Sequence, residues 1–206
     1  MREINASELS KILEEHKKWI EDEEEGERAD LYKADLSGAD LSGANLSDAY
    51  LGRTDLRKAN LREANLSKAH LDGVKLSDAN LSDANLSDAN LTGRYLHKTD
   101  LSRADLRRAD LRKADLSYAD LREADLREAD LSYADLSYAW LSKADLEGAC
   151  LSEANLSYAY LIHADLSGAN LTQVHLSINQ LSVVKTLYEA KLDPELMEQV
   201  KDKYPH

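Results

Sequence analysis

The sequence predicts an all-β solenoid, and three observations lead to that fold class. Leucine occupies every fifth position from Leu31 to Leu181, alanine usually stands two positions before it, and aspartate or asparagine usually stands just before it. A period of five gives no single stripe on an α-helix, and it places successive leucines on opposite sides of a straight strand. The chain must therefore bend once per pentad and return leucine and alanine to one interior, which each coil buries only by stacking on its neighbours.

The repeat unit Ala-(Asp/Asn)-Leu-x-x, seen for example in residues 79–83, resembles the signature of the pentapeptide-repeat family across residues 29–183. This resemblance implies a right-handed quadrilateral β-helix of about eight coils, with four pentads in each coil and short α-helical caps at both ends. The outward second x position agrees with a four-sided coil. Charged residues twenty apart at this position are opposite in sign in nine pairs and alike in two. At a spacing of fifteen, seven charged pairs are opposite in sign and four are alike; at a spacing of twenty-five, seven are opposite and three are alike.

Residues 1–28 precede the repeats and predict an N-terminal cap, formed by an amphipathic helix and an acidic linker. Asn5 or Ser7 can serve as the N-cap, and the acidic run 21–25 followed by Gly26 is expected to end the helix. An uncovered β-helix end exposes strand edges and core leucines, so we expect this helix to cover the first coil. A partner-binding helix is the alternative. The residues at helical spacing are Leu9, Ile12, Leu13, His16, Trp19 and Ile20.

Residues 184–206 follow the repeats and predict a C-terminal cap with a short helix. In the Asp-Pro-Glu sequence at 193–195, aspartate is a typical N-cap and proline suits the first helical position. Leu196, Met197 and Val200 give this helix one apolar side, which we expect to face the last coil. In some members of the family that the repeats resemble, a C-terminal segment forms a dimer. The sequence is therefore compatible with a monomer and with a dimer formed through a terminal cap.

Arg94 is the clearest irregularity of the array. It occupies an inward position that is normally alanine, and a guanidinium buried there without a partner is too costly to persist. Thr54 and Thr99 stand at equivalent positions and are small enough to fit. We therefore expect the coil to bulge or Arg94 to turn outward, with a probable kink between Thr92 and Thr99.

Aromatic residues gather in register when the coil contains twenty residues. Tyr118, Tyr138 and Tyr158 stack along one line, and Trp140 lies directly under Tyr160. One interpretation is a surface ladder that stabilises the coil. The other interpretation is an aromatic contact strip for a partner.

The net charge of −13 is large but is not evenly spread. Many of the acids are aspartates just before leucine, where the carboxylate can bond the local backbone at the bend. The outward positions carry a basic cluster at Arg103, Arg107, Arg108 and Arg112. Aspartates interleave with this cluster and the whole chain is acidic, so we expect no direct nucleic-acid binding.

Mimicry of DNA is one function that the family resemblance implies. Some pentapeptide-repeat proteins protect DNA gyrase from quinolones as acidic rods of similar width to DNA. This chain resembles them in predicted fold, acidity and rod shape. It differs in having leucine where they often have phenylalanine, and in the basic cluster that interrupts its acidic surface.

No catalytic, cofactor or metal site is predicted. Six histidines and the single Cys150 are scattered and form no metal-ligand spacing, and an interior of leucine and alanine leaves no substrate cavity. Since there is no membrane span or signal peptide and only one cysteine, we expect a cytoplasmic protein that does not bind membranes. We predict a non-enzymatic structural or protein-interaction module whose partner is another protein. The alternative is a DNA mimic that binds gyrase or another topoisomerase.

Overall fold

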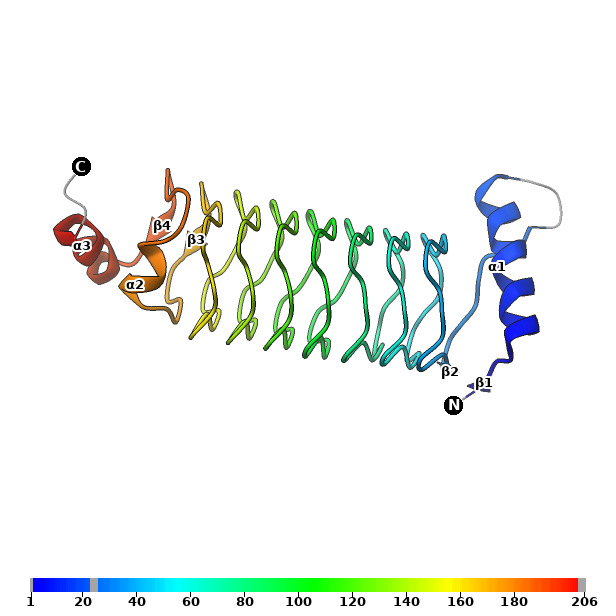
Figure 1. Cartoon of the computed structure of the whole chain (residues 1–206). Coiled ribbons are helices and arrows are strands. Elements are labelled where there is room, and N and C mark those ends of the chain that lie inside the picture. The colour runs from blue at the N-terminus through cyan, green and yellow to red at the C-terminus, as the bar shows by residue number, and fades with distance from the viewer. Residues whose placement is uncertain (1, 23–25, 204–206) are drawn as a thin grey trace.

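The computed structural model describes residues 2–22 and 26–203. The chain forms a right-handed quadrilateral β-helix, a straight-sided rod with a helix at each end (Figure 1). Parallel backbone bridges join residues 20 positions apart along nearly the whole array, as in Asn60–Asn80 and Asn80–Asp100. Twenty residues are four pentads, so the prediction of a four-sided coil is confirmed.

Each pentad turns one corner of the coil. The alanine N–H donates to the carbonyl of the leucine three residues earlier, as Ala104 does to Leu101 at 3.1 Å. Every second x position from Lys33 to Gln173 has a positive φ, including 59° at Lys113. A positive φ in the third residue of a turn is the type II pattern, and a residue other than glycine adopts it at a cost of about 1–2 kcal/mol. The stacking of the coils must outweigh this repeated strain.

Where aspartate or asparagine precedes the leucine, its side chain fixes the corner from outside. The Asp40 Oδ1 accepts a hydrogen bond from the Ser42 backbone N–H at 3.1 Å, and Asn65 Oδ1 accepts one from the Ser67 N–H at 3.1 Å. This confirms the expected bond between these side chains and the backbone at the bend. It also explains the residue type, because aspartate and asparagine reach the N–H two residues ahead.

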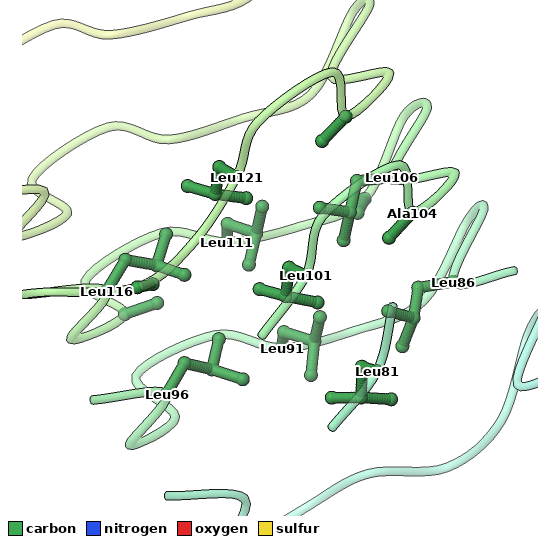
Figure 2. Packing of buried hydrophobic residues seen from close by; sticks show 14 of the residues in the cluster. Leu81, Leu86, Leu91, Leu96, Leu101, Ala104, Leu106, Leu111, Leu116 and Leu121 are labelled. Atoms are coloured by element: carbon green, nitrogen blue, oxygen red, sulfur yellow. The ribbon is translucent and has the colours of Figure 1, made fainter. Parts of the chain in front are cut away.

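Leucine and alanine fill the interior of the rod. All leucines of the repeat from Leu31 to Leu171 are buried, and Figure 2 shows those of successive coils pointing into the same interior. Burying one leucine contributes about 1.5–3 kcal/mol. Two inward threonines satisfy their hydroxyls with backbone carbonyls: Thr54 Oγ1 donates to Leu31 O at 2.6 Å, and Thr99 Oγ1 donates to Leu76 O at 3.0 Å.

The N-terminal segment covers the first coil, as expected. Helix α1 (Ala6–Ile20) follows strand β1 (Arg2–Glu3), which pairs in parallel with β2 (Ala34–Asp35). The Asn5 side chain accepts from the Glu8 N–H at 2.9 Å, so of the two candidate N-caps the structure selects Asn5. The side chains of this segment that pack against the core are Ile4, just before α1, and Leu9, Ile12 and Leu13 on α1.

The helix ends before most of the acidic linker. Glu21 is the C-cap residue, and its backbone N–H donates to the Lys17 carbonyl at 3.0 Å. Of the acidic run 21–25 that was expected to end the helix, residues 23–25 lie outside the described residues.

The β-helix continues beyond the regular repeat. Strand β3 (Asn170–Leu171) pairs in parallel with β4 (Lys191–Leu192), and Thr186 bridges to Asp165. These partners are one residue farther apart in the sequence than partners elsewhere, so one extra residue has entered the last coil. The coil therefore extends to Leu192, past the boundary at 183 that the repeat pattern predicts.

Helices α2 (Ile178–Leu181) and α3 (Pro194–Lys203) close the C-terminal end. Gln180 Nε2 donates to two carbonyls of the neighbouring coil, those of Leu156 at 2.7 Å and Ala159 at 3.0 Å. Helix α3 starts at proline as predicted. The preceding Asp193, however, accepts the Gln173 N–H through Oδ2 at 2.7 Å. Asp193 occupies the expected N-cap position, where its backbone carbonyl accepts from the Met197 N–H at 2.9 Å, but its carboxylate bonds a corner of the coil.

Candidate protein-interaction face

Three tyrosines stack along one corner of the rod. The ring centroids of Tyr118 and Tyr138 lie 4.9 Å apart and those of Tyr138 and Tyr158 lie 5.0 Å apart, with interplanar angles of 5° and 11°. Because they occupy the same repeat position in successive coils, the coil spacing sets the ring spacing. Their exposed fractions are 51, 38 and 68 %. The tyrosines therefore support one another and still present their outer sides to solvent.

A shallow groove lies on the flat side that begins at this corner. Trp140 and Tyr160 are two residues further along the chain than Tyr138 and Tyr158, and their backbones bridge between adjacent coils. The Arg122 guanidinium lies 5.1 Å from the Trp140 ring centroid, a cation–π distance. The groove has a volume of about 260 Å³ and is lined by Arg122, Trp140, Ser142, Tyr160 and Ile162.

We call six exposed apolar side chains of these coils the aromatic face: Tyr118, Tyr138, Tyr158, Trp140, Tyr160 and Ile162. Five of them were candidates from the register of the sequence. Ile162 was not, although an apolar residue at an outward repeat position where serine is common could have indicated it. Clusters of exposed apolar side chains, such as the tyrosine stack and the groove, are typical of interaction sites, whereas single exposed apolar residues are common on any surface.

Two arginines of the basic cluster pair with aspartates of the preceding coil. Arg103 donates from Nε and Nη2 to the Asp83 carboxylate at 2.6 and 2.8 Å. Arg108 donates in the same way to Asp88, with both distances 2.8 Å. These partners are the opposite charges twenty residues apart that the sequence pattern contains. Such exposed pairs contribute about 0–1 kcal/mol each.

The other two arginines of the cluster pair within their own pentads. Asp105 Oδ1 accepts from the Arg107 N–H at 3.1 Å and from its Nε at 2.8 Å, while Oδ2 accepts from Nη2 at 2.6 Å. Asp110 and Arg112 repeat this geometry, and the Arg112 guanidinium lowers the pKa of Asp110 to about 2. Of the four arginines, Arg107 and Arg108 line one hollow of the surface. Arg103 and Arg112 stand nine positions apart in a coil of twenty residues, so the structure does not gather the predicted cluster on one side, and each of its arginines faces a carboxylate.

Arg94 lies at an opening in the wall of the β-helix. Its side chain is half-buried and turns back on its own corner, where Nε donates to Thr92 O at 2.8 Å. In a regular coil, the backbone carbonyl at this repeat position accepts a hydrogen bond from the backbone N–H nineteen residues earlier; for example, Arg112 O accepts from the Gly93 N–H at 2.7 Å. For the Thr92 carbonyl, the corresponding donor would be the Gly73 N–H. Across the described array up to Leu156, the amides of Leu71, Gly73 and Asn90 lack their regular coil-to-coil hydrogen bonds, and no backbone bridge joins residues 70 and 90. The amides of Leu76 and Tyr95 also lack a short hydrogen bond, but the backbone bridge between Lys75 and Tyr95 is kept. The kink of the rod itself stays a prediction.

The repeat sequence matches a known family model over most of its length. Residues 26–48, 44–83, 84–127, 109–148 and 149–177 match the model for pentapeptide repeats, in 8 copies. The chain belongs to the pentapeptide-repeat family. No curated protein matches the chain significantly.

Several solved structures of pentapeptide repeat proteins are similar to this one. HetL, involved in heterocyst differentiation regulation in the cyanobacterium Nostoc sp. strain PCC 7120, is 29% identical, with 91% of this chain and 94% of that chain covered and a TM-score of 0.33. Full-length QnrB1, a plasmid-mediated fluoroquinolone resistance protein, is 19% identical, with 84% and 88% covered and a TM-score of 0.48. A protein from the Arabidopsis thaliana thylakoid lumen is 29% identical, with 70% and 73% covered and a TM-score of 0.22.

Within residues 2–22 and 26–203, no group of three or more His, Cys, Asp or Glu side chains is placed to hold a metal ion. None of the helices in this part of the chain is both long and apolar enough to span a membrane.

Proposed function

We propose that this pentapeptide-repeat protein is a non-catalytic interaction module that binds a partner protein through its aromatic face. The observation that carries this proposal is the exposure of six apolar side chains on three consecutive coils. Tryptophan, tyrosine and arginine dominate binding energy in protein interfaces, and all three meet here around Trp140. Stacking holds the tyrosines before any partner arrives, so binding would cost little side-chain entropy.

The geometry favours this function over mimicry of DNA. A DNA mimic needs a continuous row of free carboxylates, but the aspartates before leucine bond their own corners. Arginine guanidinium groups additionally cover Asp105, Asp110, Asp120 and Asp125 in the middle of the array. Over these coils the acidic charge is locally neutralised. The net charge of −13 therefore does not produce a uniformly acidic face there.

Photo-crosslinking in cells tests the proposal directly. A benzophenone amino acid replaces Tyr160 in the aromatic face and, in a matched control, Tyr95, which is 66 % exposed on another side of the rod. We expect a discrete crosslinked partner from position 160 that is absent from position 95 and is lost in the Trp140→Ala background. Equal crosslinking from both positions, or crosslinking that survives Trp140→Ala, would contradict the proposal.

A supercoiling assay with purified gyrase tests the alternative. We expect no inhibition by the wild-type protein at high micromolar concentration. A different result would identify the rows of aspartates, and not the aromatic face, as the functional surface: gyrase inhibition that persists in Trp140→Ala but disappears when Asp145 and Asp165 are changed to lysine.

A further inference from the structure

His16 is a buried titratable residue in the N-terminal cap. It lies on α1 with 0 % of its surface exposed and contacts two other parts of the chain through its two ring nitrogens. The Ala29 N–H donates to Nδ1 at 3.1 Å, and Nε2 lies 3.1 Å from the Ser47 carbonyl oxygen. One imidazole therefore joins the helix to the linker and to the first coil.

These partners determine the protonation state of the ring. The Ala29 N–H can only donate, so Nδ1 must be an unprotonated acceptor; the Ser47 carbonyl can only accept, so Nε2 must carry the proton. His16 is thus neutral in the closed cap, with both nitrogens used. A second proton on Nδ1 would place two N–H groups against each other and remove the bond to Ala29.

Among the described residues, the charges of Arg28 and Asp48 act on His16 in opposite directions. Burial is the main cause that lowers the pKa of His16, and the nearby Arg28 guanidinium lowers it further, while the bond to Ser47 and the charge of Asp48 raise it. Arg28 is held in place by the Asp48 carbonyl and by the Tyr50 ring, 3.9 Å from its guanidinium.

The other faces of the imidazole are equally constrained. Trp19 stacks on the ring at 5.5 Å with an interplanar angle of 12°. The neighbouring charges on α1 pair with each other, Lys18 with Glu15 at 3.1 Å and Lys17 with Glu21 at 4.0 Å.

We infer that the N-terminal cap is an acid-released latch, in which protonation of His16 detaches α1 and uncovers the first coil. Once α1 leaves, the apolar side chains of Leu9 and Leu13 lose their contact with the core. The first coil then presents unpaired backbone groups, an edge to which a further strand can add. The regular coils, which contain no comparable buried histidine among the described residues, stay folded.

The direction of the pH dependence follows from linkage. In the released cap the histidine has its ordinary pKa of 6.5, and in the closed cap its pKa is lower. The released state therefore binds the proton more readily, so the closed cap is fully stable above pH 6.5 and loses stability as the pH falls. The ratio of released to closed cap rises about tenfold for each pH unit below 6.5, until the pKa of the closed state is reached.

Fluorescence of Trp19 tests this inference in the full chain. The protein has 2 tryptophans, so Trp140→Phe leaves Trp19 as the reporter of the cap. Between pH 8 and pH 4.5 we expect a transition of Trp19 with its midpoint below pH 6.5, while the circular dichroism of the β-helix does not change. His16→Gln should abolish the transition, and His163→Gln, which changes an exposed histidine of the array, should leave it intact.

Nuclear magnetic resonance of the histidine rings in the wild-type chain tests the same inference without any substitution. We expect the Nε2-protonated tautomer of His16 at pH 8, and titration of His16 over the same pH range as the Trp19 transition. A Trp19 signal that stays flat across this range would overturn the inference. Titration of His16 at or above pH 6.5 without movement of α1 would also overturn it, as would a transition that persists in His16→Gln.

Discussion

Replacing Arg94 by alanine is expected to stabilise the protein, although most substitutions at half-buried positions destabilise. Arginine stands where the repeat has alanine, and its Nε occupies the Thr92 carbonyl. With alanine there, this carbonyl is free to accept the Gly73 N–H as the equivalent groups do in other coils. The wall of the β-helix can then close.

The magnitude follows from the missing hydrogen bonds. The amides of Leu71, Gly73 and Asn90 lack both a regular coil-to-coil hydrogen bond and a backbone bridge, and an intramolecular hydrogen bond contributes about 0.5–1.5 kcal/mol net. Against the gain of these three bonds stands the loss of the bond from Arg94 to Thr92, which is of similar size to one of the three. We expect Arg94→Ala to raise the free energy of unfolding by about 1–3 kcal/mol.

Urea unfolding combined with amide exchange measures this effect at the residues concerned. The amides of Leu71 and Gly73 should exchange quickly in the wild type and become protected in Arg94→Ala. Thr99→Ala is the matched control, because Thr99 also replaces an inward alanine but bonds the Leu76 carbonyl of the neighbouring coil. It should lower stability by about 0.5–1.5 kcal/mol. If Arg94→Ala lowers stability, or leaves these two amides unprotected, the explanation of the open wall is wrong.

Three further predictions concern corners and caps. Lys113→Asn should raise the free energy of unfolding by about 0.5–1 kcal/mol, because asparagine tolerates the positive φ of 59° better than lysine does. The control Lys113→Ala should show no such gain in urea unfolding. An equal gain in both variants would refute this explanation. The Asp110 carboxylate has a pKa of about 2 beside Arg112 and an ordinary pKa of 3.8, so its contribution is complete above about pH 4 and is lost as the pH falls through 2. The stability difference between wild type and Asp110→Asn, measured by urea unfolding at each pH, should shrink over that range, and a constant difference would contradict the pairing. Gln180→Ala should cost about 1–3 kcal/mol, because the Ala159 carbonyl loses the side-chain donor that bonds it, whereas the Leu156 carbonyl still accepts from the Ala159 N–H. We expect faster amide exchange in α2 with the central coils unchanged, and unchanged exchange in α2 would count against this role.

The sequence allowed the course of the main chain to be predicted, because the repeat makes the same local demand at every corner. Leucine and alanine must return to one interior, and charges at the second x position alternate with the spacing of one coil. The positive φ at that position was not predicted. Its signal was present in residues such as Gly38 and Gly43, which stand where the turn requires the left-handed region.

The candidate site was only partly accessible from sequence. Register placed Tyr118, Tyr138 and Tyr158 in one stack, since identical repeat positions must lie above one another. It did not indicate whether an arginine pairs with the preceding coil, as Arg103 does, or with its own pentad, as Arg107 does. The difference depends on the reach of the side chain from each repeat position. The neutralised basic cluster therefore became visible only with side chains in place.

The four-sided coil was implied by the resemblance to the pentapeptide-repeat family, with which the charge spacing agrees. The sequence by itself determined the solenoid and the need for a cap at each end. Those features follow from a period that is repeated many times, so that local geometry and the burial of leucine give the same answer in every coil. Tertiary structure alone decided what happens where the repeat is absent or broken: the Ala29 and Ser47 backbone groups that hold His16, the extra residue that lets the coil run on to Leu192, and the wall that opens beside Arg94. Each of these depends on contacts between residues that meet only once in the chain, and no periodic pattern in the sequence encodes such contacts.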